Sequence, residues 1–154
     1  MRIRPTLLLA PLVPCLFAAA SFAQSISTAR PPSDATLTVV VTGATAEGGT
    51  VGVAVFSTAD GFPGKIEKAA KTSVQPRTAP VDSVVFRGLT PGQYAVSVYQ
   101  DLNGNGKLDS NLFGVPKEPW GTSAKVRPSL RAPRYAEGTV AVAGATRIEI
   151  LVER

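Results

Sequence analysis

Residues 88–100, GLTPGQYAVSVYQ, hold the pattern that decides the fold of this 154-residue chain. The Pro-Gly pair at 91–92 is typical of a type II turn, in which proline fixes φ and the following glycine takes a positive φ. After it, Tyr94, Val96 and Val98 lie on one side of a strand with a period of two. A tyrosine just after such a corner can hydrogen-bond back to the loop backbone, as in the tyrosine corner of Greek-key sandwiches. We predict a structural role for Tyr94, either in such a corner or as a core aromatic side chain.

The same period of two recurs elsewhere in the chain. The runs that show it lie at 36–43, 50–57, 83–88, 138–144 and 146–153, with a weaker run at 71–77. Only residues 64–71 have a helix-forming composition, enough for a turn or two. Short alternating strands separated by Gly and Pro predict an all-β fold. We expect a single antiparallel β-sandwich of about seven strands, of Greek-key type. Its first two runs, 36–43 and 50–57, are predicted to form a hairpin.

The N-terminal segment has the layout of a secretory signal peptide. Arginines at positions 2 and 4 precede an apolar run at 6–20, and small residues suited to a signal peptidase follow at 21–23. A membrane anchor is disfavoured because the run contains two prolines and is shorter than the ~20 residues of a spanning helix. We therefore expect a periplasmic or secreted protein that does not span the membrane. The predicted boundaries are a signal peptide at 1–23, a flexible leader at 24–35 and a sandwich domain at 36–154.

The composition excludes several kinds of site. The chain has no histidine, and its one cysteine, Cys15, lies in the predicted signal peptide. The exported chain would therefore have no disulfide, no thiol nucleophile, no imidazole base and no His/Cys zinc site. The net charge is +5, and the densest basic group is Lys125, Arg127, Arg131 and Arg134. So loose a group is typical of a solvated face, and export also disfavours nucleic acid, so we predict no nucleic-acid partner. We also predict a monomer.

Residues 101–109, DLNGNGKLD, follow the strand directly and match part of a calcium-loop template. They supply oxygens at positions one, three, five, seven and nine of D-x-[DN]-x-[DN]-G, and Gly106 permits the sharp turn. A hard cation takes about six to eight oxygens, so we predict Ca²⁺ as the ion, with Glu118 completing the shell. The predicted metal ligands are Asp101, Asn103, Asn105, the carbonyl of Lys107, Asp109 and Glu118.

The match to the calcium loop is incomplete. Leu112 stands at position twelve, where a helix-flanked hand has a bidentate Glu, and the preceding segment is a strand. The stretch is therefore not an EF-hand. A hairpin loop rich in Asn, Asp and Gly is the alternative, because these residues tolerate left-handed conformations and cap the backbone.

Residues 111–137 form the longest stretch without a period, and we predict one long ordered loop there. The leading hypothesis is a non-catalytic protein whose metal-bound loop orders this segment. The alternative is an envelope module that binds a glycan, peptide or protein partner through Trp120 and Tyr135. A third, less favoured hypothesis is a hydrolase that pairs Asp101 or Asp109 with Glu118.

Residues 88–123 carry a run of motifs shared with a bacterial family. The motifs are G-x-Y-A at 92–95, D-x-N-x-N-G-x-L-D at 101–109 and F-G-x-P-x-E-x-x-G-x-S at 113–123. On these motifs the chain resembles the exported bacterial domain-of-unknown-function family 2141, over residues 36–154. Family members often have His where this chain has Gln100, and Asn where it has Ala124. The resemblance implies a small exported β-sandwich, similar to prealbumin-like modules, and implies no reaction.

Overall fold

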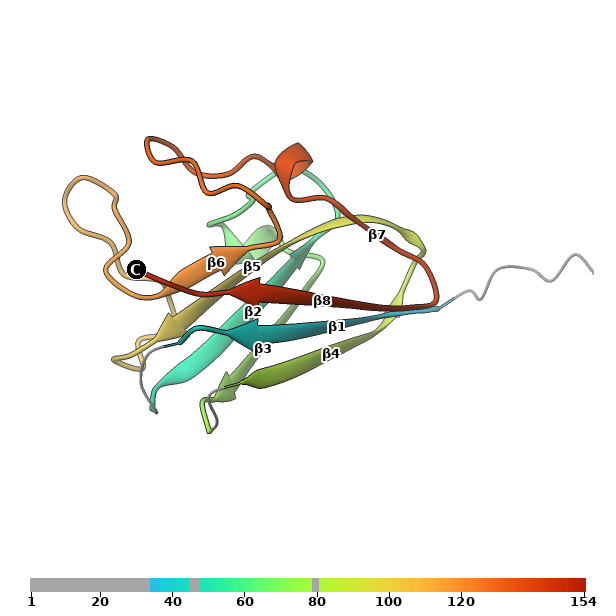
Figure 1. Ribbon diagram of the computed structural model, residues 1–154, viewed down its shortest axis with the longest axis horizontal. Helices are drawn as coiled ribbons and strands as arrows, with labels where there is room; N and C mark the ends of the chain where they lie inside the picture. Colours follow the sequence, from blue (N-terminus) through green and yellow to red (C-terminus); the bar gives the residue numbers. More distant parts are fainter. Residues whose placement is uncertain (1–33, 45–47, 79–80) are drawn as a thin grey trace, which may run out of the picture.

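The computed structural model describes residues 34–44, 48–78 and 81–154 and confirms the all-β sandwich (Figure 1). In chain order the elements are β1 (Ala35–Thr42), β2 (Thr50–Phe56), a 3₁₀ helix η1 (Ile66–Lys68), β3 (Lys71–Pro76), β4 (Asp82–Leu89), β5 (Gly92–Asp101), β6 (Trp120–Thr122), a second 3₁₀ helix η2 (Tyr135–Glu137), β7 (Val140–Val142) and β8 (Ala145–Leu151). Neither described helix has the length and apolar character needed to cross a membrane. The predicted signal peptide, and the predicted leader up to residue 33, lie outside the described residues.

The two sheets enclose one hydrophobic core. One sheet has the order β4-β1-β8, and the other has the order β3-β2-β5-β6, with β7 paired to the beginning of β5. The core side chains come mainly from every second position of β1, β2, β4 and β5, since side chains alternate between the two faces of a sheet. The predicted inward-facing side chains are confirmed as buried on β1, β2, β4 and β5: Leu37, Val39, Val41, Val51, Val53, Val55, Val84, Phe86, Tyr94, Val96 and Val98.

The strand partners differ from the prediction. β1 pairs with β4 and β8, whereas β2 pairs with β3 and β5, so the predicted hairpin between 36–43 and 50–57 is wrong. The β1–β8 pair is also parallel, so the sandwich is not wholly antiparallel. Alternation identifies the buried face of a strand. It does not identify the neighbouring strand, because both sheets bury one face in the same core.

Tyr94 forms the predicted corner. Its hydroxyl donates a hydrogen bond to the carbonyl oxygen of Thr90 at 2.7 Å, and its ring lies in the core. The turn is not type II, because Gly92 begins β5 without a positive φ, while Gly88 takes φ +66°. The predicted helix at 64–71 is reduced to η1, since Lys71 already begins β3.

The predicted long loop at 111–137 contains a strand. β6 pairs with β5 on one side, and on the other side Trp120 pairs with Glu153, just beyond β8. The two backbone hydrogen bonds of this bridge measure 3.1 and 3.2 Å. The sequence after β8 therefore joins the two sheets along this edge. β6 also divides the predicted long loop at 111–137. We call residues 102–119, before β6, the first loop and residues 123–134, after it, the second loop.

Candidate functional site

The first loop is held by the carboxylate of Asp101, the last residue of β5. Asp101 is 1% exposed, and its two oxygens accept hydrogen bonds from three backbone N–H groups, those of Gly104, Asn105 and Gly106, at 2.7–3.2 Å. Gly104 and Gly106 have positive φ, the conformation that L side chains rarely adopt. The alternating glycines therefore let the backbone turn its N–H groups toward one carboxylate.

Glu118, near the end of the same loop, binds its backbone at two points. It is 4% exposed, and its oxygens accept hydrogen bonds from the N–H of Leu102 at 2.8 Å and of Asp109 at 2.9 Å. A buried carboxylate is costly without such donors, because it has lost its hydration. The structure thus brings Glu118 to the loop, as predicted, and gives it backbone partners there.

Asp109 lies among side-chain amides at the loop surface. Its carboxylate accepts hydrogen bonds from Nδ2 of Asn103 at 2.7 Å and Nδ2 of Asn105 at 3.0 Å. These bonds, Asn105 first, and the nearby charges of Lys107 and Lys117 lower the pKa of the Asp109 carboxyl. Asp109 is therefore held in its charged form and presents an anionic centre with two amides beside it.

The predicted metal ligands share one loop, but their oxygens already have hydrogen-bond donors. Asp101 and Glu118 accept backbone N–H groups, and Asp109 accepts amide N–H groups. An ion at Asp109 would replace the amide N–H groups. Rotation of the amides of Asn103 and Asn105 could then supply oxygen ligands. Across the described residues, no three His, Cys, Asp or Glu side chains converge on a possible ion position. The chain therefore fits a hard cation only with amide or carbonyl oxygens as additional ligands.

Tyr99 fastens the first loop to the outer face of the five-stranded sheet. Its hydroxyl donates to the carbonyl oxygen of Gly106 at 3.1 Å, and its ring lies against Gly52 of β2, where a Cβ would collide with it. Burial, and then the charges of Asp101 and Glu118, raises the pKa of the Tyr99 phenol. The hydroxyl therefore stays protonated and remains a donor.

The second loop is attached by different groups. The Ser123 hydroxyl accepts the N–H of Val96 at 2.9 Å and donates to the carbonyl oxygen of Gly138. At the far end, Arg131 forms a two-pronged ion pair with Glu137. This pair, with the N–H of Arg134, lowers the pKa of Glu137 to about 2.

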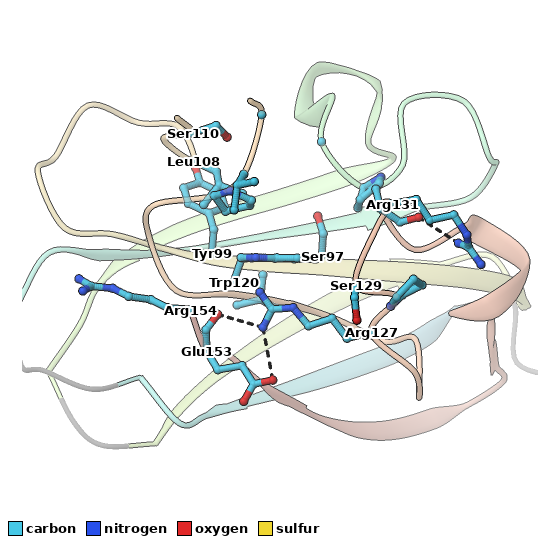
Figure 2. Close-up of a pocket in the computed structure, with 18 of the residues that line it drawn as sticks. Ser97, Tyr99, Leu108, Ser110, Trp120, Arg127, Ser129, Arg131, Glu153 and Arg154 are labelled. Carbon is cyan, nitrogen blue, oxygen red and sulfur yellow. Dashed lines mark hydrogen bonds and ion pairs between the residues drawn. The ribbon is translucent and has the colours of Figure 1, made fainter. Parts of the chain in front are cut away.

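The two loops enclose a groove of about 1100 Å³ over the outer face of β5 and β6 (Figure 2). Ser97, Tyr99 and Trp120 line its sheet side. The guanidinium of Arg127 lies 4.1 Å from the centre of the Trp120 ring and forms an ion pair of 3.3 Å with Glu153. A planar cation over an indole ring is a favourable arrangement. We call this site the loop groove; its other polar lining residues include Lys107, Ser110, Ser129, Arg131 and Arg154.

The two predicted ligand-binding aromatics lie in different places. Trp120 lines the loop groove, whereas Tyr135 is not among the described residues that line it. The Tyr135 hydroxyl donates to the carbonyl oxygen of Gln93 at 2.9 Å, and its ring packs edge-to-face on Phe62. Burial, with a smaller contribution from Tyr94, raises the pKa of the Tyr135 phenol. These contacts give Tyr135 a packing role beside β5.

Arg127, Glu153 and Tyr99 were not predicted as site residues. Glu153 and Trp120 meet only because the tail after β8 pairs with β6, a long-range contact without a local sequence pattern. Arg127 belongs to the basic group seen in the sequence. Its spacing from Trp120 follows no strand or helix period, so the contact between the two side chains could not be predicted.

The fold and the site define a class of protein: a small two-sheet sandwich with a groove, built by loops, on one outer face. The chain belongs to the family described as "Uncharacterized protein conserved in bacteria (DUF2141)", whose profile matches residues 39–149. This match confirms the resemblance found in the motifs. No curated protein matches the chain, and no solved structure does.

Proposed function

We propose that this chain is a non-catalytic binding module that takes a carbohydrate in the loop groove. The observation that carries the proposal is the Trp120–Arg127–Glu153 group, which sets an aromatic ring, a guanidinium and a carboxylate side by side in an open groove. Pockets that bind small ligands combine apolar and aromatic walls with a few placed polar groups.

A sugar suits this combination of groups. Each sugar hydroxyl both donates and accepts hydrogen bonds, so a guanidinium donor next to a carboxylate acceptor can engage neighbouring hydroxyls. The hydroxyls of Ser110 and Ser129 add groups of the same dual character at the groove lining. The weakly polar C–H faces of a sugar ring can also lie against aromatic side chains.

Hydrolysis by the three acidic residues has less support. Asp101, Asp109 and Glu118 are not among the described lining residues of the groove. The carboxylates of Asp101 and Glu118 instead face backbone N–H groups of the first loop.

The test is a glycan array followed by calorimetry on any saccharide that binds. Arg127→Gln should weaken binding at least tenfold without lowering the melting temperature appreciably, because Arg127 is a surface residue of the groove. Tyr135→Phe is the matched control, since Tyr135 lies outside the groove lining, and it should bind normally. Absence of any bound saccharide, or full binding by Arg127→Gln, would contradict the proposal.

Calcium binding by the first loop is a second candidate function. The observation in its favour is the convergence of the Asn103 and Asn105 amides on the Asp109 carboxylate within 2.7–3.0 Å. An ion there would be held by Asp109 and the turned amides, with the Lys107 carbonyl, Asp101 and Glu118 as the other predicted ligands. A cation bound only by the folded state raises stability with the logarithm of its concentration.

Thermal unfolding with calcium and with chelator tests this second candidate. Asp109→Ala is the informative variant, because Asp101→Ala and Glu118→Ala also remove bonds to backbone N–H groups. The wild type should melt higher in calcium, and Asp109→Ala should lose that shift while the exposed-site control Asp60→Asn keeps it. An unchanged melting temperature of the wild type would rule calcium out.

Export completes the proposal. The basic, apolar and small-residue segments of 1–23 support removal of a signal peptide and a periplasmic or secreted location. N-terminal sequencing of the protein recovered from the bacterial envelope should begin at or near Gln24.

A further inference from the structure

The first and second loops gather the most exposed apolar side chains of the described chain. Leu112 is 100% exposed, Phe113 is 90% exposed and Leu130 is 99% exposed. The described part has ten exposed large apolar residues, and six of them lie in these two loops. These six are the three just named together with Leu102, Val115 and Val126. Single exposed apolar residues are ordinary, so it is the concentration at two loops that calls for a partner.

Most of the excess positive charge of the protein lies in the same two loops. Residues 102–119 and 123–134 hold six basic residues and two acidic residues, Asp109 and Glu118. The sequence has 16 basic and 11 acidic residues, so the rest of it holds ten basic and nine acidic residues and is nearly balanced. The basic residues of the loops are Lys107, Lys117, Lys125, Arg127, Arg131 and Arg134.

Both loops extend on the same side of the molecule. Figure 1 shows them as the two orange segments at the upper left, beyond β6. Phe113 and Leu130 also line the same groove, from its two walls. We call Leu112, Phe113 and Leu130 the apolar tips. Because both loops extend on the same side, these tips can contact one surface together.

We propose that these tips dock on an anionic lipid surface. Leu112, Phe113 and Leu130 would enter the boundary between headgroups and acyl chains, while Lys117, Lys125 and Arg134 contact lipid phosphates. Apolar insertion combined with basic attraction is how peripheral proteins bind such membranes. Long Lys and Arg side chains can keep their charge at the headgroups while neighbouring apolar groups go deeper.

Charge and shape favour lipid over a protein partner. The cores of protein interfaces are depleted of charged residues, Lys in particular, whereas charges here alternate with the apolar tips. Pairing with a second copy would bring two basic surfaces together, which opposes association. The apolar groups also stand on two separate loops rather than in one flat patch.

Co-sedimentation with vesicles of phosphatidylcholine, alone or with phosphatidylglycerol, tests the proposal. The protein should partition onto the mixed vesicles and scarcely onto phosphatidylcholine alone, and salt should weaken the binding. Leu112→Ser with Phe113→Ser should reduce partitioning at least tenfold. The matched control is Val74→Ser on β3, also exposed and apolar, which should change it less than twofold. Any contribution from residues 6–20 would be common to all variants, so ratios between variants isolate the loops.

A charge variant separates the two contributions. Lys117→Gln, Lys125→Gln and Arg134→Gln together should reduce binding to the mixed vesicles and its salt dependence, whereas Lys65→Gln with Arg147→Gln should leave both nearly unchanged. Equal binding to the two kinds of vesicle would overturn the proposal. So would equal losses in Val74→Ser and the tip variant, or self-association through the tips without lipid binding. Carbohydrate binding in the groove does not enter these outcomes, so either proposal can fail without the other.

Discussion

The two loops that enclose the groove are fixed to the same sheet by different chemistry. Two buried carboxylates hold the first loop by accepting backbone N–H groups. The second loop relies on the Ser123 hydroxyl and on two surface ion pairs, Arg127 with Glu153 and Arg131 with Glu137. Buried charge-assisted hydrogen bonds are strong and costly to break, whereas surface ion pairs are weak and screened by salt. The first loop should therefore behave as an extension of the core, and the second as the adjustable wall of the groove.

The largest effect is expected from Asp101→Ala. This change leaves three N–H groups of the first loop without their acceptor and removes a charge-assisted interaction. We expect a loss of roughly 3 kcal/mol in the free energy of unfolding, measured by urea denaturation. Asp60→Ala, which removes an exposed partner of Lys68, should cost under about 0.5 kcal/mol. A loss below about 1 kcal/mol in Asp101→Ala would remove the distinction between the two loops.

Glu118→Gln should have the next largest effect. The amide keeps one acceptor oxygen but presents its NH₂ group to the other backbone donor, either that of Leu102 or that of Asp109. We expect roughly 2 kcal/mol of destabilisation. Hydrogen exchange should also accelerate at the amides of these two residues before it does so in β2. Uniform acceleration throughout the sheet would show that the loop has no separate opening.

Ser123→Ala tests the neutral attachment of the second loop. It removes the acceptor of the Val96 N–H and the donor to Gly138. The expected cost is about 1 kcal/mol, the ordinary contribution of hydrogen bonds between uncharged groups. Ser129→Ala, an exposed change in the same loop, should be close to neutral. A cost as large as that of Asp101→Ala would show that the two loops are attached equally strongly.

The smallest effect is pH-dependent and concerns Glu137. Its pKa is lowered from 4.5 to about 2 in the folded state, so its contribution to stability is present above about pH 4.5 and is lost as the pH falls through 2. An NMR titration of the Glu137 carboxyl should give a midpoint near 2. Arg131→Gln should move this midpoint upward, because the pair with Arg131 is the largest cause of the shift. An unchanged midpoint in that variant would contradict the assignment.

The sequence was sufficient to predict the buried apolar faces of β1, β2, β4 and β5. Alternation in β1 or β5 is a local property, and it identified Leu37, Val39, Val96 and Val98 as core residues. Strand neighbours are set by long-range pairing, so the predicted first hairpin failed while the fold class held. The Pro-Gly turn was misassigned because β5 begins at Gly92, where strand pairing takes precedence over turn preference.

The candidate site was also predictable only in part. The pattern at 101–109 and the position of Glu118 predicted a loop that binds a cation. The structure brings Asp101, Asp109 and Glu118 to one loop, where each accepts N–H groups, and calcium binding stays a prediction. The pattern does not distinguish carboxylates that bind a cation from carboxylates that accept backbone N–H groups, because both arrangements use the same acidic residues and glycines. The loop groove escaped prediction since Trp120, Arg127 and Glu153 come from three separate segments.

The pairing of Glu153 with Trp120 has a practical consequence for anyone handling this protein. Arg154, the next residue after that bridge, itself lines the loop groove. An affinity tag or fusion partner joined directly after Arg154 would emerge at the groove, where it would hinder access to the site. An engineered attachment at the beginning of β1 would avoid the tail that lines the groove.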